Sequence, residues 1–284
     1  MKALIERNLK VFFRDKASVF FSLLAVLIIF LLYMLFLGDV WQQNLPKVAG
    51  TRAMMDSWIM AGVLAVTSLT TVMGAFGTMV DDRQNKIVKD FSASPVSRGK
   101  IVAGYEIASF LVGSIMSLLG FVFAEVYIVM RGGAMLAFGP ALESIGLILL
   151  SALCNTAMVS LVVSFIKTQN AFGTASSILG TLVGFLTGIY LPIGMLPAGV
   201  QTVIKIFPLS HAALLLRQVM MAVPMQQVFA GAPAALTTEF QQEMGVYFQL
   251  GGQTLSTGVS LAILVGSTAI FYLLSTLRFS RKAR

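Results

Sequence analysis

Few side chains in this sequence could carry out chemistry. The chain of 284 residues has one cysteine, Cys154, and one histidine, His211. An intrachain disulfide is therefore impossible, and a site that needs two imidazoles is not expected. No zinc-protease, dithiol, nucleophile-elbow or phosphate-loop motif occurs along the chain. These absences argue against an enzyme that holds its own nucleotide, metal or redox centre.

Three polar side chains stand inside long apolar segments. Glu106 and Glu125 are nineteen residues apart, which on one helix is about 28 Å, so we expect one carboxylate near each membrane surface. A carboxylate at that depth costs far less than a central one, and a local hydrogen bond is its simplest explanation. Asn155 is expected near the middle of another helix. It would make either an interhelical hydrogen bond or a substrate contact.

The composition places these segments in a membrane. Hydrophobic residues make up 57% of the chain and charged residues only 11%, whereas a soluble domain carries about 25% charged residues. Most of the surface must therefore face lipid. The net charge is +8, but the basic residues lie at the ends of apolar runs. That distribution indicates contact with a membrane surface and not with nucleic acid.

The apolar runs predict an all-α membrane protein with six transmembrane helices, preceded by an amphipathic interfacial helix over residues 1–17. The uncharged run 168–204 would be about 55 Å long as one helix, which is too long for a bilayer core of about 30 Å. Pro192 and Pro197 interrupt it, so we expect a re-entrant helical hairpin between helices five and six. The predicted crossings are 17–38, 58–80, 101–130, 144–166, 171–190 and 258–277, and segment 191–257 holds the hairpin and an outer loop.

The distribution of basic residues predicts the orientation of this single transmembrane domain, 1–284. Fifteen of the 20 Lys and Arg residues lie in segment 1–17, segment 81–100, the turn at Lys167 and the C-terminal tail. The other five lie in the loops on the opposite side. Because positive residues remain in the cytoplasm, we expect both termini to be cytoplasmic.

Segment 81–100 is a charged island between two apolar runs. Asp81 or Asp82 could cap a short helix over residues 82–92, on which Ile87 and Phe91 would lie one turn apart. Pro95 would end that helix, and a new one could begin at Ser97. An exposed Ile and Phe among charges favour a docking surface, although a solvated loop is the simpler alternative.

Small and hydroxyl residues form stripes on two predicted helices. Because such stripes let helix backbones approach closely, tight packing is the simpler explanation. The alternative is that these faces meet at a subunit boundary and part to admit a substrate. The stripe on the second crossing comprises Thr67, Thr71, Gly74 and Thr78, and that on the fifth comprises Gly173, Thr174, Ser177, Gly180, Thr181, Gly184 and Gly188.

The order of these elements resembles the type-two exporter permeases of ATP-binding-cassette (ABC) transporters. Residues 91–98, Phe-Ser-Ala-Ser-Pro-Val-Ser-Arg, are similar to the family's Leu-Leu-x-Ser-Pro-x-Ser-Arg loop end. The family's hairpin pattern of two prolines, a Pro-Leu pair and an arginine matches Pro192, Pro197, Pro208-Leu209 and Arg217. One departure is that the usual Glu and Gly at the start of the loop are here Asp82 or Asp81 and Asn85.

The resemblance implies a permease subunit of an exporter in the plasma membrane of a prokaryote, with lipid around it. Two copies of an ABC ATPase subunit would hold ATP and Mg²⁺, and this chain would hold no cofactor. A second permease, with a homodimer favoured, would complete the pathway. Few charges in the crossings favour a lipophilic or amphipathic substrate, such as a drug, a lipid or a lipid-linked glycan. The alternatives are a membrane scaffold or sensor, or an intramembrane enzyme. The predicted ATPase-coupling residues are Asp82, Lys86, Ile87, Phe91, Pro95 and Arg98.

Overall fold

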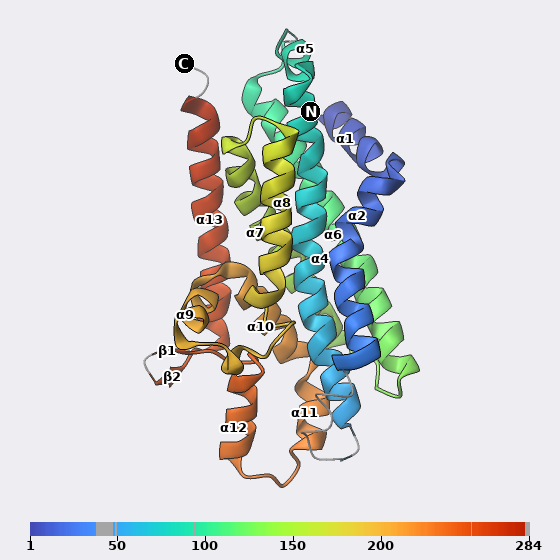
Figure 1. The fold of residues 1–284 in the computed structure, drawn as a ribbon, viewed down its shortest axis with the longest axis vertical. Coiled ribbons are helices and arrows are strands. Elements are labelled where there is room, and N and C mark those ends of the chain that lie inside the picture. Colours follow the sequence, from blue (N-terminus) through green and yellow to red (C-terminus); the bar gives the residue numbers. More distant parts are fainter. Residues whose placement is uncertain (38–47, 49, 94, 251, 282–284) are drawn as a thin grey trace.

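The protein is an elongated bundle of helices in its computed structural model (Figure 1). The start of α1 (Lys2–Arg14), the short helix α5 (Ile87–Ala93) and the end of α13 (Thr257–Arg281) lie at one end of the bundle. We call this the basic end, because the sequence segments richest in Lys and Arg gather there. The opposite end is called the far end. The structure describes residues 1–37, 48, 50–93, 95–250 and 252–281.

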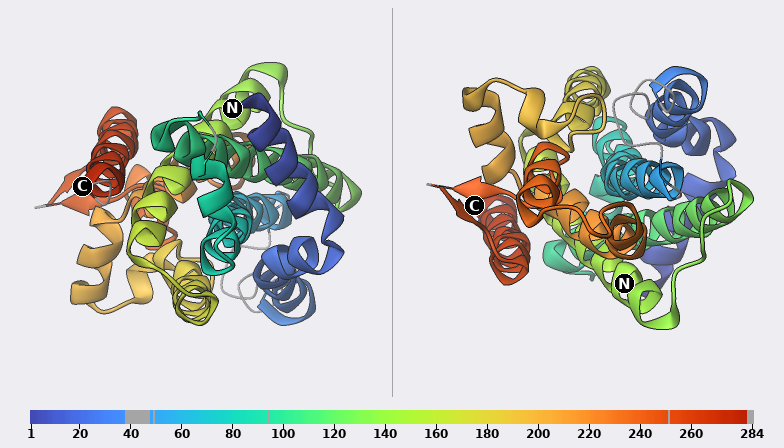
Figure 2. Two further views of the ribbon diagram at one scale, coloured as in Figure 1. Left: turned by 90° about the horizontal axis from the view of Figure 1, so that it is seen from above. Right: turned by 90° about the horizontal axis from the view of Figure 1, so that it is seen from below.

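Helix α4 (Thr51–Gln84) is the axis of the bundle. Its 34 residues span about 50 Å, and 89% of its apolar window is buried within the protein. Viewed along the bundle, α4 lies inside while α13 lies at the edge (Figure 2). The helices packed around α4 include α2 (Lys16–Leu32), α6 (Arg98–Met130), α7 (Phe138–Phe165) and α8 (Gln169–Leu186).

The N-terminal region folds as predicted into a short helix followed by a long apolar one. Asp15 ends α1 and caps α2, since its Oδ1 accepts hydrogen bonds from the backbone N–H groups of Ala17 at 3.0 Å and Ser18 at 3.1 Å. A π-helical turn over Tyr33–Leu37 extends α2. The combined helix bends by 45°. Gly38, the predicted end of this crossing, lies outside the described residues.

The all-α, multi-pass prediction is confirmed. Within the described residues, α4, α6, α7 and α13 are each long and apolar enough to cross a membrane. Two bent helix pairs raise the number of candidate spans to as many as six. The predicted crossing 171–190 corresponds to α8, which is not among the four. It has only 18 residues and begins with the polar Gln169 and Asn170.

The proline-rich segment is broken where the sequence indicated. Pro192 precedes a 3₁₀ turn (Ile193–Met195), Pro197 precedes α9 (Ala198–Ile206), and Pro208 is the first residue of α10 (Pro208–Met220). A proline costs little at a helix start, where its missing N–H would have no helical partner. Helices α9 and α10 meet at 85°.

The far end is completed by elements that project beyond α10. Two helices, α11 (Ala222–Val228) and α12 (Ala234–Glu243), extend away from the bundle (Figure 1). A small antiparallel ribbon, β1 (Gln249–Leu250) and β2 (Gln253–Thr254), leads into α13.

One boundary prediction was wrong. Residues 82–92 do not form one helix capped by Asp81 or Asp82, because α4 continues to Gln84 and α5 starts only at Ile87. Lys86 separates the two helices with a left-handed φ of 64°. The two other boundaries predicted within segment 81–100 are confirmed: α5 ends before Pro95, and Ser97 is the N-cap of α6.

Candidate functional site

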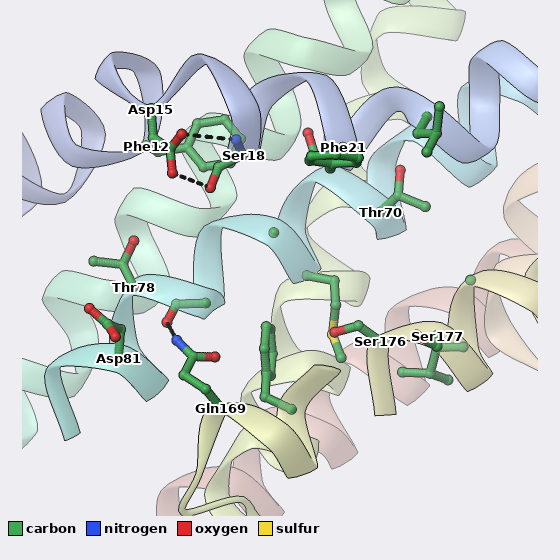
Figure 3. Close-up of a pocket in the computed structure, with 18 of the residues that line it drawn as sticks. Phe12, Asp15, Ser18, Phe21, Thr70, Thr78, Asp81, Gln169, Ser176 and Ser177 are labelled. Atoms are coloured by element: carbon green, nitrogen blue, oxygen red, sulfur yellow. Dashed lines mark hydrogen bonds between the residues drawn. The ribbon is translucent and has the colours of Figure 1, made fainter. Parts of the chain in front are cut away.

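The small-residue stripes of α4 and α8 face a common groove. Helix α2 forms the third wall, and the cavity between the three helices measures about 850 Å³. Figure 3 shows Ser18 and Phe21 from α2, Thr70 and Thr78 from α4, and Ser177 from α8 around this space. The predicted pathway residues that line it are Gly74, Thr78, Ser177, Gly180 and Thr181.

The groove changes character along its length. Its charged residues, Arg7, Asp15, Asp81 and Asp82, lie toward the basic end. Apart from the amide of Gln169, the remainder is lined by apolar, glycine and hydroxyl residues. The Thr181 hydroxyl donates to Ser177 O of its own helix at 2.9 Å. Such a wall offers weak polarity beside apolar surface, which suits an amphipathic molecule.

The glycines of the stripes have different surroundings. A Cβ atom added at Gly180 would have no atom within 4 Å, so this position is open to the groove. At Gly74 the space is already narrow, because an added Cβ would lie 3.0 Å from Ser22 Cβ of α2. At Gly184 the ring of Tyr190 occupies the place of a side chain. Gly184 therefore serves packing within the chain, and of the two stripe glycines that line the groove, Gly74 and Gly180, only Gly180 is open to a ligand or a partner.

Four other predicted residues lie away from the groove lining. Thr67 and Thr71 are buried, and each donates to a backbone carbonyl one turn earlier at 2.7 Å. Asn155 is also buried, and its Nδ2 donates to Ser68 Oγ at 2.9 Å, which links α7 to α4. Thr174 is exposed on α8 and bonded to Asn170 O. A substrate contact for Asn155 stays a prediction.

The two intramembrane glutamates make local hydrogen bonds. Glu106 accepts from Ser160 Oγ at 2.5 Å and from the Tyr272 hydroxyl at 3.0 Å, which joins α6 to α7 and α13. Glu125 accepts from the backbone N–H of Leu136 at 2.9 Å. Both glutamates thus make local hydrogen bonds, which the sequence analysis gave as their simplest explanation.

At the basic end, three helices meet at Asp82. Arg7 of α1 forms a two-pronged salt bridge with its carboxylate, and the Tyr105 hydroxyl of α6 donates to the same group at 2.6 Å. The hydrogen bond to Asp82 raises the pKa of Arg7. Asp82 is only 2% exposed, so in this structure it binds its own chain. The sequence analysis did not predict that Arg7 and Tyr105 bind Asp82. The one signal for this pairing was that all three residues were expected at the same membrane surface.

The predicted coupling residues around α5 lie at the tip of the basic end (Figure 1). Lys86, Pro95 and Arg98 are exposed, whereas Ile87 and Phe91 are half-buried against the rest of the chain. The Arg7 guanidinium stands 5.6 Å from the centre of the Phe91 ring. Through Arg7, α5 is therefore connected to the Asp82 junction. Its contact with an ATPase stays a prediction.

At the far end, the predicted hairpin residue Arg217 is fully buried. Its Nη2 donates to Thr187 O at 2.8 Å and its Nη1 points to Gly245 O at 3.5 Å. The guanidinium lies 4.6 Å from the centre of the Trp58 ring. Arg217 thus ties α10 to α4, to the end of α8 and to the segment after α12.

One family match covers most of the site residues described above. The family model described as "ABC-2 type transporter" matches residues 1–221, which include the groove, the Asp82 junction, α5 and Arg217. The chain belongs to this family. A comparison with individual curated proteins gave no match.

The ABC-2 assignment confirms the resemblance drawn from the charged segment and the prolines. An ABC-2 membrane subunit has no nucleotide-binding site of its own and works with an ABC ATPase subunit. The chain is thus a multi-pass membrane component of a transporter. Among the described residues, no group of three or more His, Cys, Asp or Glu side chains could hold a metal ion.

Proposed function

We propose that this ABC-2 subunit is the permease of an ATP-driven exporter that moves a lipophilic or amphipathic substrate out of the cytoplasm or the inner leaflet. The observation that carries this proposal is the groove between α2, α4 and α8, which is charged at one end and weakly polar elsewhere. The family match favours a transporter over the scaffold, sensor and enzyme alternatives.

Two copies of the chain would form the pathway, with the exposed face of α8 from each copy meeting near the groove. This face combines the hydroxyl residues Thr174, Ser177 and Thr181 with the exposed Ile178 and Leu182. Small residues allow close helix approach in membranes. Two ATPase subunits would supply ATP and Mg²⁺ and would dock around α5, with Lys86, Ile87, Phe91, Pro95 and Arg98 at the contact.

The orientation proposed for the exporter places the basic end in the cytoplasm of a prokaryotic cell. In this proposal α8 is the fifth of six crossings, with α2, α4, α6, α7 and α13, and the α9–α10 pair is a re-entrant hairpin facing outside. The excess of Lys and Arg at the basic end supports it. A membrane-impermeant thiol reagent tests it with Lys86→Cys and Glu239→Cys, each on a Cys154→Ser background. We expect intact cells to be labelled at 239 and not at 86; the reverse pattern contradicts this orientation.

Substitution of Gly180 tests the groove as the substrate pathway. An added Cβ at this position has no atom within 4 Å, so Gly180→Leu should leave the fold intact while its side chain occupies part of the groove. The control is Gly146→Leu, because Gly146 is an exposed glycine of α7 with equally open surroundings and no part in the groove.

The measurement is ATP hydrolysis by the reconstituted complex, stimulated by a rhodamine dye and by a fluorescent phospholipid. We expect at least one probe to stimulate the wild type and the Gly146→Leu control, and Gly180→Leu to lose that stimulation. Stimulation that survives Gly180→Leu would show that the pathway lies elsewhere. Absence of stimulation by both probes would contradict the proposed substrate class.

Cross-linking tests the two-copy pathway. Thr181→Cys on the Cys154→Ser background should form a disulfide between copies if the two α8 faces meet, since the two Cα atoms must come within about 7 Å. Gly146→Cys should not. Equal yields from the two variants, or no dimer from either, would contradict the proposed contact.

A further inference from the structure

A second cavity opens at the basic end, on the other side of α4 from the groove. It measures about 1250 Å³ and is bordered by α4, α5, α6, α13 and the turn between α7 and α8. This volume exceeds the roughly 300–1,000 Å³ of ordinary small-molecule sites. No described residue lines both the groove and this cavity.

The charge of this cavity is strongly one-sided. Among the residues that the structure describes, four cationic side chains line it, and the one acidic side chain in its lining is Glu106. Glu106 accepts hydrogen bonds from Ser160 and Tyr272, and among the described residues it forms no salt bridge with any of the four cations. The four cations are Arg83, Lys89, Arg98 and Lys167.

The four cations differ in how firmly they are held. The Nη1 of Arg83 donates to the carbonyls of Val163 at 3.0 Å and Ile166 at 2.6 Å, at the C-terminus of α7. Lys89, Arg98 and Lys167 are exposed. The cavity therefore has one guanidinium held by the end of α7 and three exposed charges around its mouth, which is an arrangement that suits an anionic headgroup.

The cavity also has apolar walls that continue to the lipid-facing surface. Ile101 and Val102 of α6 and Phe279 of α13 contribute to the lining. Only 11% of the apolar window of α13 is buried, and Leu273 and Leu277, close to the lining residues Tyr272 and Thr276, are 61% and 46% exposed. A molecule with acyl chains could enter sideways from the bilayer.

We infer that this cavity binds an anionic phospholipid, with its phosphate among Arg83, Lys89, Arg98 and Lys167 and an acyl chain along α6 and α13. Basic pockets between transmembrane helices on the cytoplasmic side are known to select anionic headgroups. Lys89 belongs to α5, so the bound lipid would touch the proposed ATPase-docking helix directly. This inference does not depend on which substrate the exporter carries.

Native mass spectrometry of the purified full chain, without the ATPase, tests the inference with dioleoyl phosphatidylglycerol and dioleoyl phosphatidylcholine. The test variant is Lys89→Gln/Lys167→Gln. The control is Lys10→Gln/Lys100→Gln, which removes two exposed lysines of the same end that do not line the cavity. The test variant lacks two of the four cationic contacts to the headgroup, so it should bind phosphatidylglycerol at least about tenfold more weakly.

The expected result is that the control retains phosphatidylglycerol like the wild type, and that phosphatidylcholine binds all three proteins equally weakly. An equal loss in test and control variants would overturn the inference, because binding would then reflect general surface charge. Soluble glycerol 3-phosphate should not displace the lipid. If it does so at similar concentrations, the cavity recognises a phosphate alone and the lipid assignment is wrong.

A last arm distinguishes the lipid from a protein occupant. We expect phosphatidylglycerol to remain bound when the ATPase subunit is added. If the ATPase displaces the lipid, and if Lys89→Gln/Lys167→Gln also prevents ATPase binding, the cavity is part of the ATPase interface and the inference is overturned.

Discussion

Two arginines hold together opposite ends of this ABC-2 subunit by different means. Arg7 at the basic end is paired with the carboxylate of Asp82, and its side chain is 34% exposed. Arg217 at the far end is fully buried, and its partners among the described residues are two backbone carbonyls and the Trp58 ring. One junction thus depends on charge pairing beside water, and the other on a delocalised cation in a dry site.

The difference matches the surroundings of the two junctions. Guanidinium is weakly hydrated and planar, so it can be buried against an aromatic face and carbonyls without a carboxylate. A carboxylate as buried as Asp82 needs a cation, because an unpaired buried charge is costly. The Asp82 junction connects α1, α4 and α6 next to α5, and water can replace part of its contacts. We therefore expect the basic end to rearrange more readily than the far end.

The largest expected effect is at the charge pair. Arg7→Met leaves Asp82 buried with the Tyr105 hydroxyl as its remaining hydrogen-bond donor among the described residues, and breaking such a pair costs about 3–5 kcal/mol. Thermal unfolding in one detergent, followed by circular dichroism, measures the loss. Arg7→Met/Asp82→Asn should recover part of it, because no buried charge is then left over. If the double variant is less stable than Arg7→Met, charge pairing does not explain the junction.

At Arg217 we expect a smaller loss of stability. We also expect that keeping the positive charge, with lysine in place of arginine, does not reduce that loss. Arg217→Met removes the hydrogen bond to Thr187 O but leaves an apolar chain on Trp58, at a cost of about 1–3 kcal/mol. Arg217→Lys should be no better, since a compact ammonium cannot span the two carbonyls and stack at once. The same unfolding assay compares them. A Lys variant of wild-type stability beside an unstable Met variant would mean that charge alone matters here as well.

The sequence predicted the elements of both junctions better than their contacts. The apolar runs located α2, α4, α6, α7 and α13, because lipid exposure demands long uncharged helices. The prolines located the breaks before α9 and α10 for a local steric reason. The Arg7–Asp82 pair joins residues 75 positions apart, and no local pattern could identify it.

The candidate site shows the same limit. The stripes on α4 and α8 were visible as spacing, but which stripe residue is open depends on neighbouring helices. Gly184 is covered by Tyr190 and Gly74 by Ser22, while Gly180 is uncovered. The end of α4 was misplaced because the charges of Asp81 and Asp82 suggested a loop, whereas burial of Asp82 by Arg7 lets the helix continue.

A third test addresses the aromatic partner at the far end. Trp58 Nε1 donates to Met244 O at 2.7 Å while its ring faces Arg217. Trp58→Phe keeps a ring for Arg217 and removes this one hydrogen bond, so we expect a loss of about 1 kcal/mol. Trp58→Leu should lose clearly more, because the cation–π contact is removed too. Equal losses in the two variants would show that the ring does not stabilise Arg217.

The smallest expected effect concerns Asp15, an exposed carboxylate at the same end as the buried Asp82. Hydrogen bonds from Ser18, first from its hydroxyl and then from its backbone N–H, lower the pKa of Asp15. A lowered pKa means that the cap stabilises the folded chain above the pKa of the unfolded state, near 4, and that this stabilisation is lost as the pH falls through the folded value. Asp15→Ala should thus lower the melting temperature slightly at pH 7, and the difference from wild type should shrink toward pH 3. Asp15→Asn, which can still cap α2, should be more stable than Asp15→Ala, and the difference between these two variants should not depend on pH because neither carries a titrating group at this position. A difference between wild type and Asp15→Ala that is the same at both pH values would mean that the ionised carboxylate does not stabilise the start of α2.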